Sequence, residues 1–401
     1  MRILLGLLFL ISGLTLSAAT SNKPNPTTYK LRRLEASQLA FQNPSAGETA
    51  LKSLLKEKPE DTELLFLIAN AVGARGRLLQ PGKQRREVMR EARDYFVRAE
   101  KAGQTDPMIA SALREINTDG SENQTPGSAN SSAEKEFRAA ERAFESRDFS
   151  SAISHYNAAL AYEPKNYPIT VALGDAYFAQ EKFAEAIQWF EKAIALEPDR
   201  ELAHRYCGDA LMRLGKKDEA LEHFLAAVVA EPYNGYTWRG LQTACKAMLL
   251  KVWTPAAMTP TANLKFGTKG LEIQLPKEAN MLATAYGVSR AAWVKEHHSE
   301  QFNRRSPYRQ TLEEEVGALT SLLKIRSELQ QAKSSPEIQT ALEQSGPSLD
   351  ELAEIQAAGL LEPHILFSRA NADIAQDYAD YRAKNRDKLR AYLVKFYLHL
   401  P

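Results

Sequence analysis

The 401-residue sequence has only two cysteines, no excess of charge of either sign and no long apolar run after its first twenty positions. Two cysteines cannot build the dense disulfide framework of a small secreted domain. Cys207 and Cys245 both occupy positions typical of apolar helix interior, so we expect two buried free thiols, with a single bridge as the alternative. Lys and Arg number 51 against 50 Asp and Glu. This balance does not suggest the basic surface that nucleic acids and anionic membranes select, so no nucleic-acid partner is expected.

Motifs of the common catalytic sites are missing as well: the chain has no glycine-rich phosphate loop, no serine nucleophile elbow and no reactive-cysteine setting. His297 and His298 stand near Glu300, but adjacent helical residues diverge by about 100°, whereas a zinc-binding helix spaces its histidines four apart. We interpret this cluster as a solvated helix end. Two acidic clusters have structural interpretations: a charged first helical turn for Glu313, Glu314 and Glu315, and complementarity to the helix dipole for Asp373, Asp377 and Asp380. We therefore expect no metal and no cofactor.

The N-terminus has the pattern of an export signal. Arg2 precedes an apolar run from Ile3 to Leu16, and the small residues Ser17, Ala18 and Ala19 follow it. These are the parts of a secretory signal peptide, and the run falls short of the roughly 20 residues that span a bilayer. We predict a signal peptide at 1–19, with an uncleaved anchor as the alternative. Cleavage removes Arg2 and leaves 50 basic and 50 acidic residues, in a periplasmic or secreted protein without an integral membrane span.

The most informative feature is a repeat period of about 34 residues in the middle of the chain. Prolines recur at this interval, and four further positions keep the same phase: Pro164, Pro198, Pro232; Ala152, Ala186, Ala220; Ala159, Ala193, Ala227; Tyr156, Phe190, Phe224; and Ala140, Gly174, Gly208. Small residues let two helices approach closely, and the aromatic residue fills the space beside them. Proline then ends the unit because it cannot continue a helix. The period therefore predicts stacked helix pairs.

This pattern resembles the tetratricopeptide repeat (TPR). The residues that match the family's pattern are Gly174, Tyr177, Ala186, Phe190, Ala193 and Pro198 in one unit, and Gly208, Ala220, Phe224, Ala227 and Pro232 in the next. The preceding unit departs slightly, because its turn at Glu145–Phe149 reads as one residue short and leaves the register of its first helix open. The resemblance implies an all-α solenoid of helical hairpins that binds other polypeptides.

The expected organisation follows from where the period begins and ends. Three repeats (133–166, 167–200 and 201–234) precede a capping helix at 235–250, whose Trp238, Leu241 and Cys245 should face the stack. A weaker echo, in which Gly76 takes the place of Gly215, predicts divergent TPR-like helices at 29–118 with an enlarged basic loop from Arg77 to Arg86. A flexible linker at 119–132 follows it. Residues 251–401 are expected to form a mostly helical domain with a short strand at Leu271–Leu275.

The resemblance also implies a binding site, because the first helix of each TPR unit lines a concave groove that holds partner segments. In this chain the corresponding residues are Val171, Asp175, Phe178, Leu202, Arg205, Asp209, Met212, Arg213, Tyr236, Arg239, Thr243 and Lys246. Val171 and Asp175 stand where a clamp for a chaperone tail would need lysine and asparagine, so such a tail is not expected. Arg205 and Arg239 lie one repeat period apart and predict a ligand with one or two acidic residues beside an apolar anchor.

These features predict a non-enzymatic scaffold or adaptor of the cell envelope that binds a segment of another protein or peptide in the groove. One alternative is a subunit of an envelope assembly complex that leaves the groove unused. Another is an enzyme whose site lies in the C-terminal domain, since catalytic groups can converge from distant positions.

Overall fold

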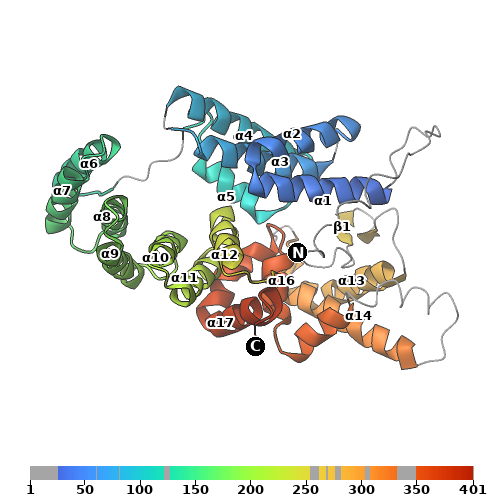
Figure 1. Ribbon diagram of the computed structural model, residues 1–401. Coiled ribbons are helices and arrows are strands. Elements are labelled where there is room, and N and C mark those ends of the chain that lie inside the picture. The colour runs from blue at the N-terminus through green and yellow to red at the C-terminus, as the bar shows by residue number, and fades with distance from the viewer. Residues whose placement is uncertain are drawn as a thin grey trace, which may run out of the picture. The chain divides into compact units, whose positions relative to one another are not determined.

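The computed structural model describes residues 26–59, 61–80, 82–121, 127–252, 262–267, 270–275, 281–302, 308–331 and 349–400. Nearly all regular structure in these ranges is helical, which confirms the predicted all-α class (Figure 1). The chain divides into two compact units: Met1–Gln104 with Ile116–Ser121, and Thr105–Glu115 with Glu122–Pro401. None of the described helices is long and apolar enough to cross a membrane. The predicted signal peptide at 1–19 lies outside the described residues.

The first unit contains two helix pairs, α1 (Pro26–Gln42) with α2 (Pro44–Glu57) and α3 (Thr62–Arg77) with α4 (Lys83–Lys101). The enlarged basic loop predicted for Arg77–Arg86 is shorter than predicted, because α3 continues to Arg77 and α4 already begins at Lys83. The extra residues lengthen the helices, since the apolar face of α4 extends back to the buried Val88 and Met89. Gly76 accordingly packs inside α3 against Met89, and is not the turn residue that Gly215 is.

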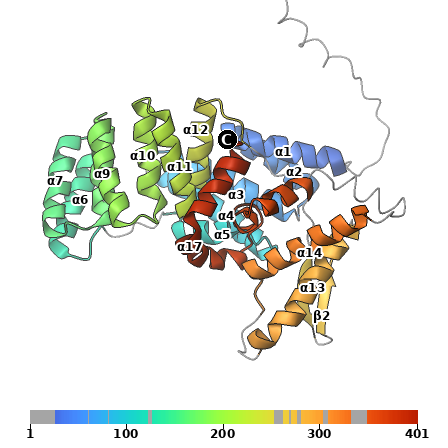
Figure 2. The same cartoon turned by 90° about the horizontal axis from the view of Figure 1, so that it is seen from below.

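In the second unit, three helix pairs and one further helix stand side by side in a row (Figure 2). The pairs are α6 (Ser131–Glu145) with α7 (Phe149–Tyr162), α8 (Tyr167–Ala179) with α9 (Phe183–Leu196), and α10 (Glu201–Arg213) with α11 (Lys217–Ala230); α12 (Gly235–Ala247) follows. A Cβ atom on Gly174 would lie 2.5 Å from the Phe190 ring, and one on Gly208 would lie 2.9 Å from Phe224. The two glycines are therefore required where a second helix packs closely.

The turns inside the three pairs are equal in length. Each turn contains one residue with positive φ, at Arg147 (61°), Glu181 (60°) and Gly215 (76°), and these residues again keep the repeat interval. A residue in this left-handed conformation commonly ends a helix. The first repeat is therefore in register with the others, and the shortened turn inferred for Glu145–Phe149 is wrong. The absence of glycine at positions 147 and 181 hid the equivalence in the sequence.

Two boundaries differ from the prediction. The later part of the linker predicted at 119–132 packs on the first repeat: the Asn166 side-chain amide donates to the Gly127 carbonyl at 2.7 Å, and the Asn130 side chain caps α6. Helix α5 (Pro107–Glu115) belongs to the second unit. The prediction had placed it in the first helical block, 29–118. Within the second unit the Ala372 amide donates to the Thr105 carbonyl at 2.8 Å.

The C-terminal region is mostly helical, as predicted. Its elements are the strands β1 (Asn263–Gly267) and β2 (Gly270–Gln274), then α13 (Met281–Phe302), α14 (Leu312–Gln331), α16 (Leu361–Ser368), the 3-10 helix η1 (Ile374–Asp377), α17 (Tyr378–Tyr392) and the π-helix η2 (Leu393–Tyr397). The strand expected at Leu271–Leu275 is present as β2. Its antiparallel partner β1 was not predicted; Leu271 lies opposite Phe266 in this hairpin.

Helix α12 does not end the array. Leu241 and Cys245 are fully buried, as predicted, but the Trp238 ring packs against Phe367 and Tyr397, with centroids 5.8 and 5.2 Å away. One continuous hydrophobic core runs from the last two repeats into the C-terminal helices. The C-terminal domain therefore covers the end of the array, and Trp238 contacts both that domain and the last repeat, where its indole N–H donates to the Pro232 carbonyl at 2.6 Å.

Candidate binding groove and buried charge network

The first helices of the pairs, together with α12, line the inner side of the curved row of repeats (Figure 1). Eleven of the twelve predicted groove residues are at least partly accessible; Arg213, Arg239, Thr243 and Lys246 are exposed. Val171 is the exception, with 4% of its surface exposed. It belongs to the core between neighbouring helices, and its place in the predicted groove surface is a correction.

Arg205 is already engaged within the protein. Its Nε donates to the Glu201 carboxylate at 2.9 Å, and that carboxylate is itself almost buried. The guanidinium also lies 4.9 Å from the centroid of the Tyr206 ring and 5.2 Å from that of Tyr236. These contacts pair the charge of Arg205 within the protein and fix its position, so they do not favour the predicted role of Arg205 in holding an acidic ligand. Arg239 remains exposed, 5.8 Å from the Tyr236 ring.

Acidic side chains recur on the same groove at the repeat interval: Glu141, Asp175 and Asp209. The Tyr156 hydroxyl donates to Glu141, whereas the structure shows no hydrogen bond or ion pair for Asp175 or Asp209 among the described residues. Burial raises the pKa of both aspartates to about 6. The negative charge of Glu141 adds to the rise at Asp175, and Arg205 partly offsets it at both. Each aspartate therefore carries a charge at neutral pH without a direct partner.

An apolar row accompanies the acidic one. Phe144, Phe178 and Met212 keep the repeat interval on the same helices and are partly buried. The Phe178 ring packs edge-on against Phe183, with centroids 5.2 Å apart, which holds it in place. Glu141 and Phe144 were missed in the prediction because the register of the first repeat was left open, although the repeat period alone identifies them.

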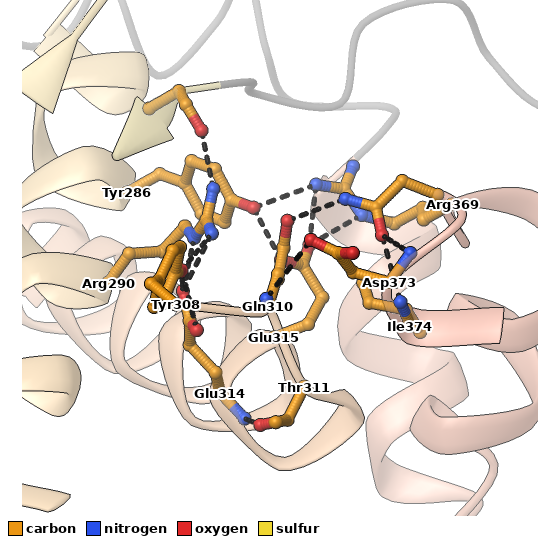
Figure 3. Close-up of polar contacts among 12 residues, drawn as sticks. Tyr286, Arg290, Tyr308, Gln310, Thr311, Glu314, Glu315, Arg369, Asp373 and Ile374 are labelled. Atoms are coloured by element: carbon orange, nitrogen blue, oxygen red, sulfur yellow. Dashed lines mark hydrogen bonds and ion pairs between the residues drawn. The ribbon is translucent and has the colours of Figure 1, made fainter. Parts of the chain in front are cut away.

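The C-terminal domain contains a network of buried charges (Figure 3). Glu315 is 2% exposed and accepts hydrogen bonds from the Tyr286 hydroxyl at 2.6 Å and from Arg369 at 2.9 Å. Glu314 is 1% exposed and pairs with Arg290, 2.6 Å away. Burial opposes ionisation of Glu315, but its attraction to Arg369 and the Tyr286 hydrogen bond leave its pKa below the usual value. For Glu314 the effect of burial exceeds the opposing attraction of Arg290, and its pKa is raised.

Both carboxylates of this network accept hydrogen bonds from several donors. The Tyr308 hydroxyl donates to Glu314 at 2.7 Å, the Gln310 side-chain amide to Glu315 at 2.8 Å, and Arg290 also donates to the Ala262 carbonyl at 2.5 Å. Two arginines balance two glutamates. The geometry therefore indicates a structural role, which is to fix α14 against α13 and against the segment before η1.

This network corrects two interpretations. Glu313–Glu315 is not simply a charged first turn, because two of its three carboxylates are buried and paired. Asp373 and Asp377 do not merely complement a helix dipole: Asp377 accepts the Leu312 amide at 2.8 Å and pairs with Arg309 at 2.7 Å. The Gln310 amide lies 3.4 Å from the Asp373 carboxylate. The two aspartates thus accept hydrogen bonds from backbone amides at the start of α14, although they lie far from it in the sequence. Their spacing along one helix does not reveal this tertiary role.

Of the histidine cluster, the structure describes the side chain of His297. The His297 ring stacks on Trp293 with centroids 4.4 Å apart, while the side chains of His298 and Glu300 lie outside the described part. Within the described ranges no group of three or more His, Cys, Asp or Glu residues is arranged to hold a metal ion. Cys207 and Cys245 are free and buried, which confirms the prediction.

Comparison with known proteins agrees with the repeat geometry. Two tetratricopeptide-repeat family models match residues 137–201 and 178–243. A search of curated proteins gave no match.

Solved structures similar to parts of the chain include the second TPR domain of human RPAP3 in complex with an HSP70 peptide (26% identity, 28% of this chain and 94% of that chain, TM-score 0.27). Others are the Sgt2 TPR domain from Aspergillus fumigatus (22% identity, 32% and 85%, TM-score 0.29) and MamA from Desulfovibrio magneticus (18% identity, 52% and 97%, TM-score 0.24). At these TM-scores the similarities support no functional assignment. The matched residues, 137–243, belong to the tetratricopeptide-repeat superfamily.

Proposed function

We propose that the repeats form a protein-interaction module that binds an extended or helical segment of a partner carrying a basic side chain beside an apolar one. The two aspartates without partners, Asp175 and Asp209, carry this proposal. A lysine or arginine of the ligand placed between them supplies the opposite charge that each of them lacks. The apolar side chain packs against Phe178 and Met212, whose flexible thioether adapts to ligands of different shape.

The charge around Arg205 supports a basic ligand over an acidic one. Glu201, Asp209 and Asp175 all interact electrostatically with this single arginine. Three carboxylates thus share one arginine at the centre of the groove, and the Arg205 Nε already donates its hydrogen bond to Glu201. Arg239 and Lys246 contribute positive charge at the α12 end, and Arg213 at the end of α10 pairs with Glu181 at 3.9 Å. A partner segment is therefore best matched when its basic residue lies over α8 and α10.

This function is tested with the chain that lacks the predicted signal peptide, residues 1–19, and an array of short peptides of varied composition. Bound peptides are expected to be enriched in lysine or arginine next to large apolar residues. In a titration, the Asp175→Asn/Asp209→Asn double variant should bind the best peptide about tenfold more weakly or worse, because a hydrogen bond to a charged group is worth about 1.5–3 kcal/mol. Binding by the parent should also strengthen as the pH rises through about 6, where the two carboxyls lose their protons.

The matched control is Asp218→Asn, the same substitution at an exposed position on α11. Enrichment of acidic peptides, or equal affinity of the double variant and the control, would show that these aspartates do not bind the peptide.

For the location of the protein, we propose export and signal cleavage, on the basis of the N-terminal pattern alone. The intact mass of protein purified from its native cells is expected to correspond to a chain that begins at or near Thr20. A full-length mass in the membrane fraction would contradict this proposal. Cleavage would also place the groove where only envelope or external partners reach it.

A further inference from the structure

The groove residues change in character at α12, the last helix that lines the groove. On the three earlier helices the repeat interval places an acidic row and an apolar row: Glu141, Asp175 and Asp209, and Phe144, Phe178 and Met212. The next positions of these two rows, on α12, are Thr243 and Lys246. The acidic row thus ends in a neutral hydroxyl group, and the apolar row ends in a cation. The α12 end of the groove therefore differs in charge from the part formed by α8 and α10.

The groove face of α12 carries positive charge and no negative charge. Arg239, Thr243 and Lys246 lie on this face because they follow one another at intervals of four and three residues, and all three are exposed. The helix contains no aspartate or glutamate. A ligand that reaches α12 therefore meets two cations.

Neither cation has a charged partner in the described part of the chain. The structure shows no hydrogen bond or ion pair there from the side chain of Arg239 or Lys246. The Arg239 guanidinium lies 5.8 Å from the centroid of the Tyr236 ring. Desolvation and the positive charge of Arg205 lower the pKa of Arg239, and no carboxylate opposes this change. Arg239 and Lys246 are therefore accessible cations whose charge a ligand can balance.

Helix α12 packs directly beside α10, which sets the distance between the two charged regions of the groove. Arg205 on α10 lies 5.2 Å from the centroid of the Tyr236 ring, and a Cβ atom on Gly240 would lie 3.5 Å from the Cδ of Arg205. The axes of helices packed in this way are about 8–10 Å apart, and three residues of an extended chain span about 10 Å. A ligand residue over Asp209 is therefore followed, three residues away, by one over α12.

We propose that the groove binds a segment with charges of both signs: a basic side chain over Asp175 and Asp209, and an acidic side chain about three residues away over Arg239 and Lys246. This inference rests on the proposed function and adds the second charge to the ligand. The acidic side chain accepts charge-assisted hydrogen bonds from the two cations. A segment with charges of one sign brings a like charge to one end of the groove, and this repulsion favours a partner of mixed charge.

The test uses the chain without residues 1–19 and two short peptides that are blocked at both termini, so that only side chains carry charge. Both peptides contain one lysine beside a leucine, and the residue three positions from the lysine is aspartate in one and asparagine in the other. Calorimetry is expected to show that the aspartate peptide binds about fivefold more tightly, the upper end of what an exposed ion pair contributes. The pair is measured with this residue before and after the lysine, because either chain direction places the two charges over the same helices.

Variants of the two charged regions separate this inference from the proposed function. In Arg239→Gln/Lys246→Gln the two peptides should bind equally, and the asparagine peptide should bind at least as tightly as it does to the parent. This second result shows that the groove remains intact. Asp175→Asn/Asp209→Asn should weaken the binding of both peptides but keep their ratio, because it removes the site of the lysine alone.

The matched control is Arg147→Gln/Lys165→Gln, which replaces one exposed arginine and one exposed lysine outside the groove and should keep the ratio of the parent. Equal affinity of the two peptides for the parent, in both orders, would overturn this inference and leave the proposed function standing. A difference that persists in Arg239→Gln/Lys246→Gln would overturn it as well. Unchanged affinities in Asp175→Asn/Asp209→Asn would contradict the proposed function, and no binding of either peptide would contradict both.

Discussion

Replacing Arg369 with methionine is expected to lower the free energy of unfolding of the second unit by about 3–5 kcal/mol. Methionine keeps much of the volume but leaves the buried carboxylate of Glu315 without its main counter-charge, and Arg369 pairs with that carboxylate at 2.7 Å. The two side chains are only 9% and 2% exposed, so water cannot replace the lost partner. The measurement is the urea midpoint and slope followed by circular dichroism. Hydrogen exchange in α14 reports whether the loss is local.

The control for this prediction is Arg390→Met, the same substitution in an ion pair with about half of each side chain exposed. Its loss should stay within about 1 kcal/mol, because exposed ion pairs contribute little. The double variant Glu315→Gln/Arg369→Met should recover part of the lost stability, since it removes the uncompensated charge as well. Similar stability of Arg369→Met and Arg390→Met would show that Glu315 is not buried as the structure has it.

Replacing Ala227 with glutamate is expected to cost about 4 kcal/mol or more, which should unfold the third repeat. Ala227 is fully buried on α11, and a glutamate there has neither space nor a partner for its charge. Gly208→Leu should cost about 1–3 kcal/mol, because even its Cβ would lie 2.9 Å from the Phe224 ring. Helical content and urea unfolding measure both effects.

The control for Ala227→Glu is Ala184→Glu, an exposed position in the first turn of α9, where a negative charge is favourable. This variant should unfold like the parent. If Ala227→Glu and Gly208→Leu also unfold like the parent, the assignment of 201–234 as a TPR helix pair is wrong.

The repeat was predictable because its signal is local and periodic. Gly174 and Gly208, with the aromatic residues opposite them, report helix contacts inside one repeat unit, and each unit packs mainly on its neighbours. The residues that line the groove follow from the same period, with Val171 as the exception. Its burial depends on the packing of the adjacent helix, which no position within its own unit specifies.

In the first helical block, α1 to α4, sequence spacing alone did not predict the structure correctly. Gly76, which carries the weak echo, is buried inside α3, and half of the predicted loop from Arg77 to Arg86 is helix. The spacing favoured a loop, because Gly76 and Ala92 lie farther apart than the equivalent Gly215 and Ala220. The buried face of α4, which includes Val88 and Met89, decides otherwise, since helices in proteins are stabilised mainly by tertiary packing of an amphipathic face.

The sequence by itself determined the all-α class, the helix pairs of residues 137–243 and the row of acidic groove residues, because all three depend on spacing along the chain. The tertiary structure alone decided the charge state of the groove and the buried network around Glu314 and Glu315. Glu201 pairs with Arg205 on one helix turn, but Glu315 pairs with Arg369 from a distant part of the chain. Contacts at such separations leave no period in a sequence, and the free energy of a buried charge depends on which partner the fold places beside it.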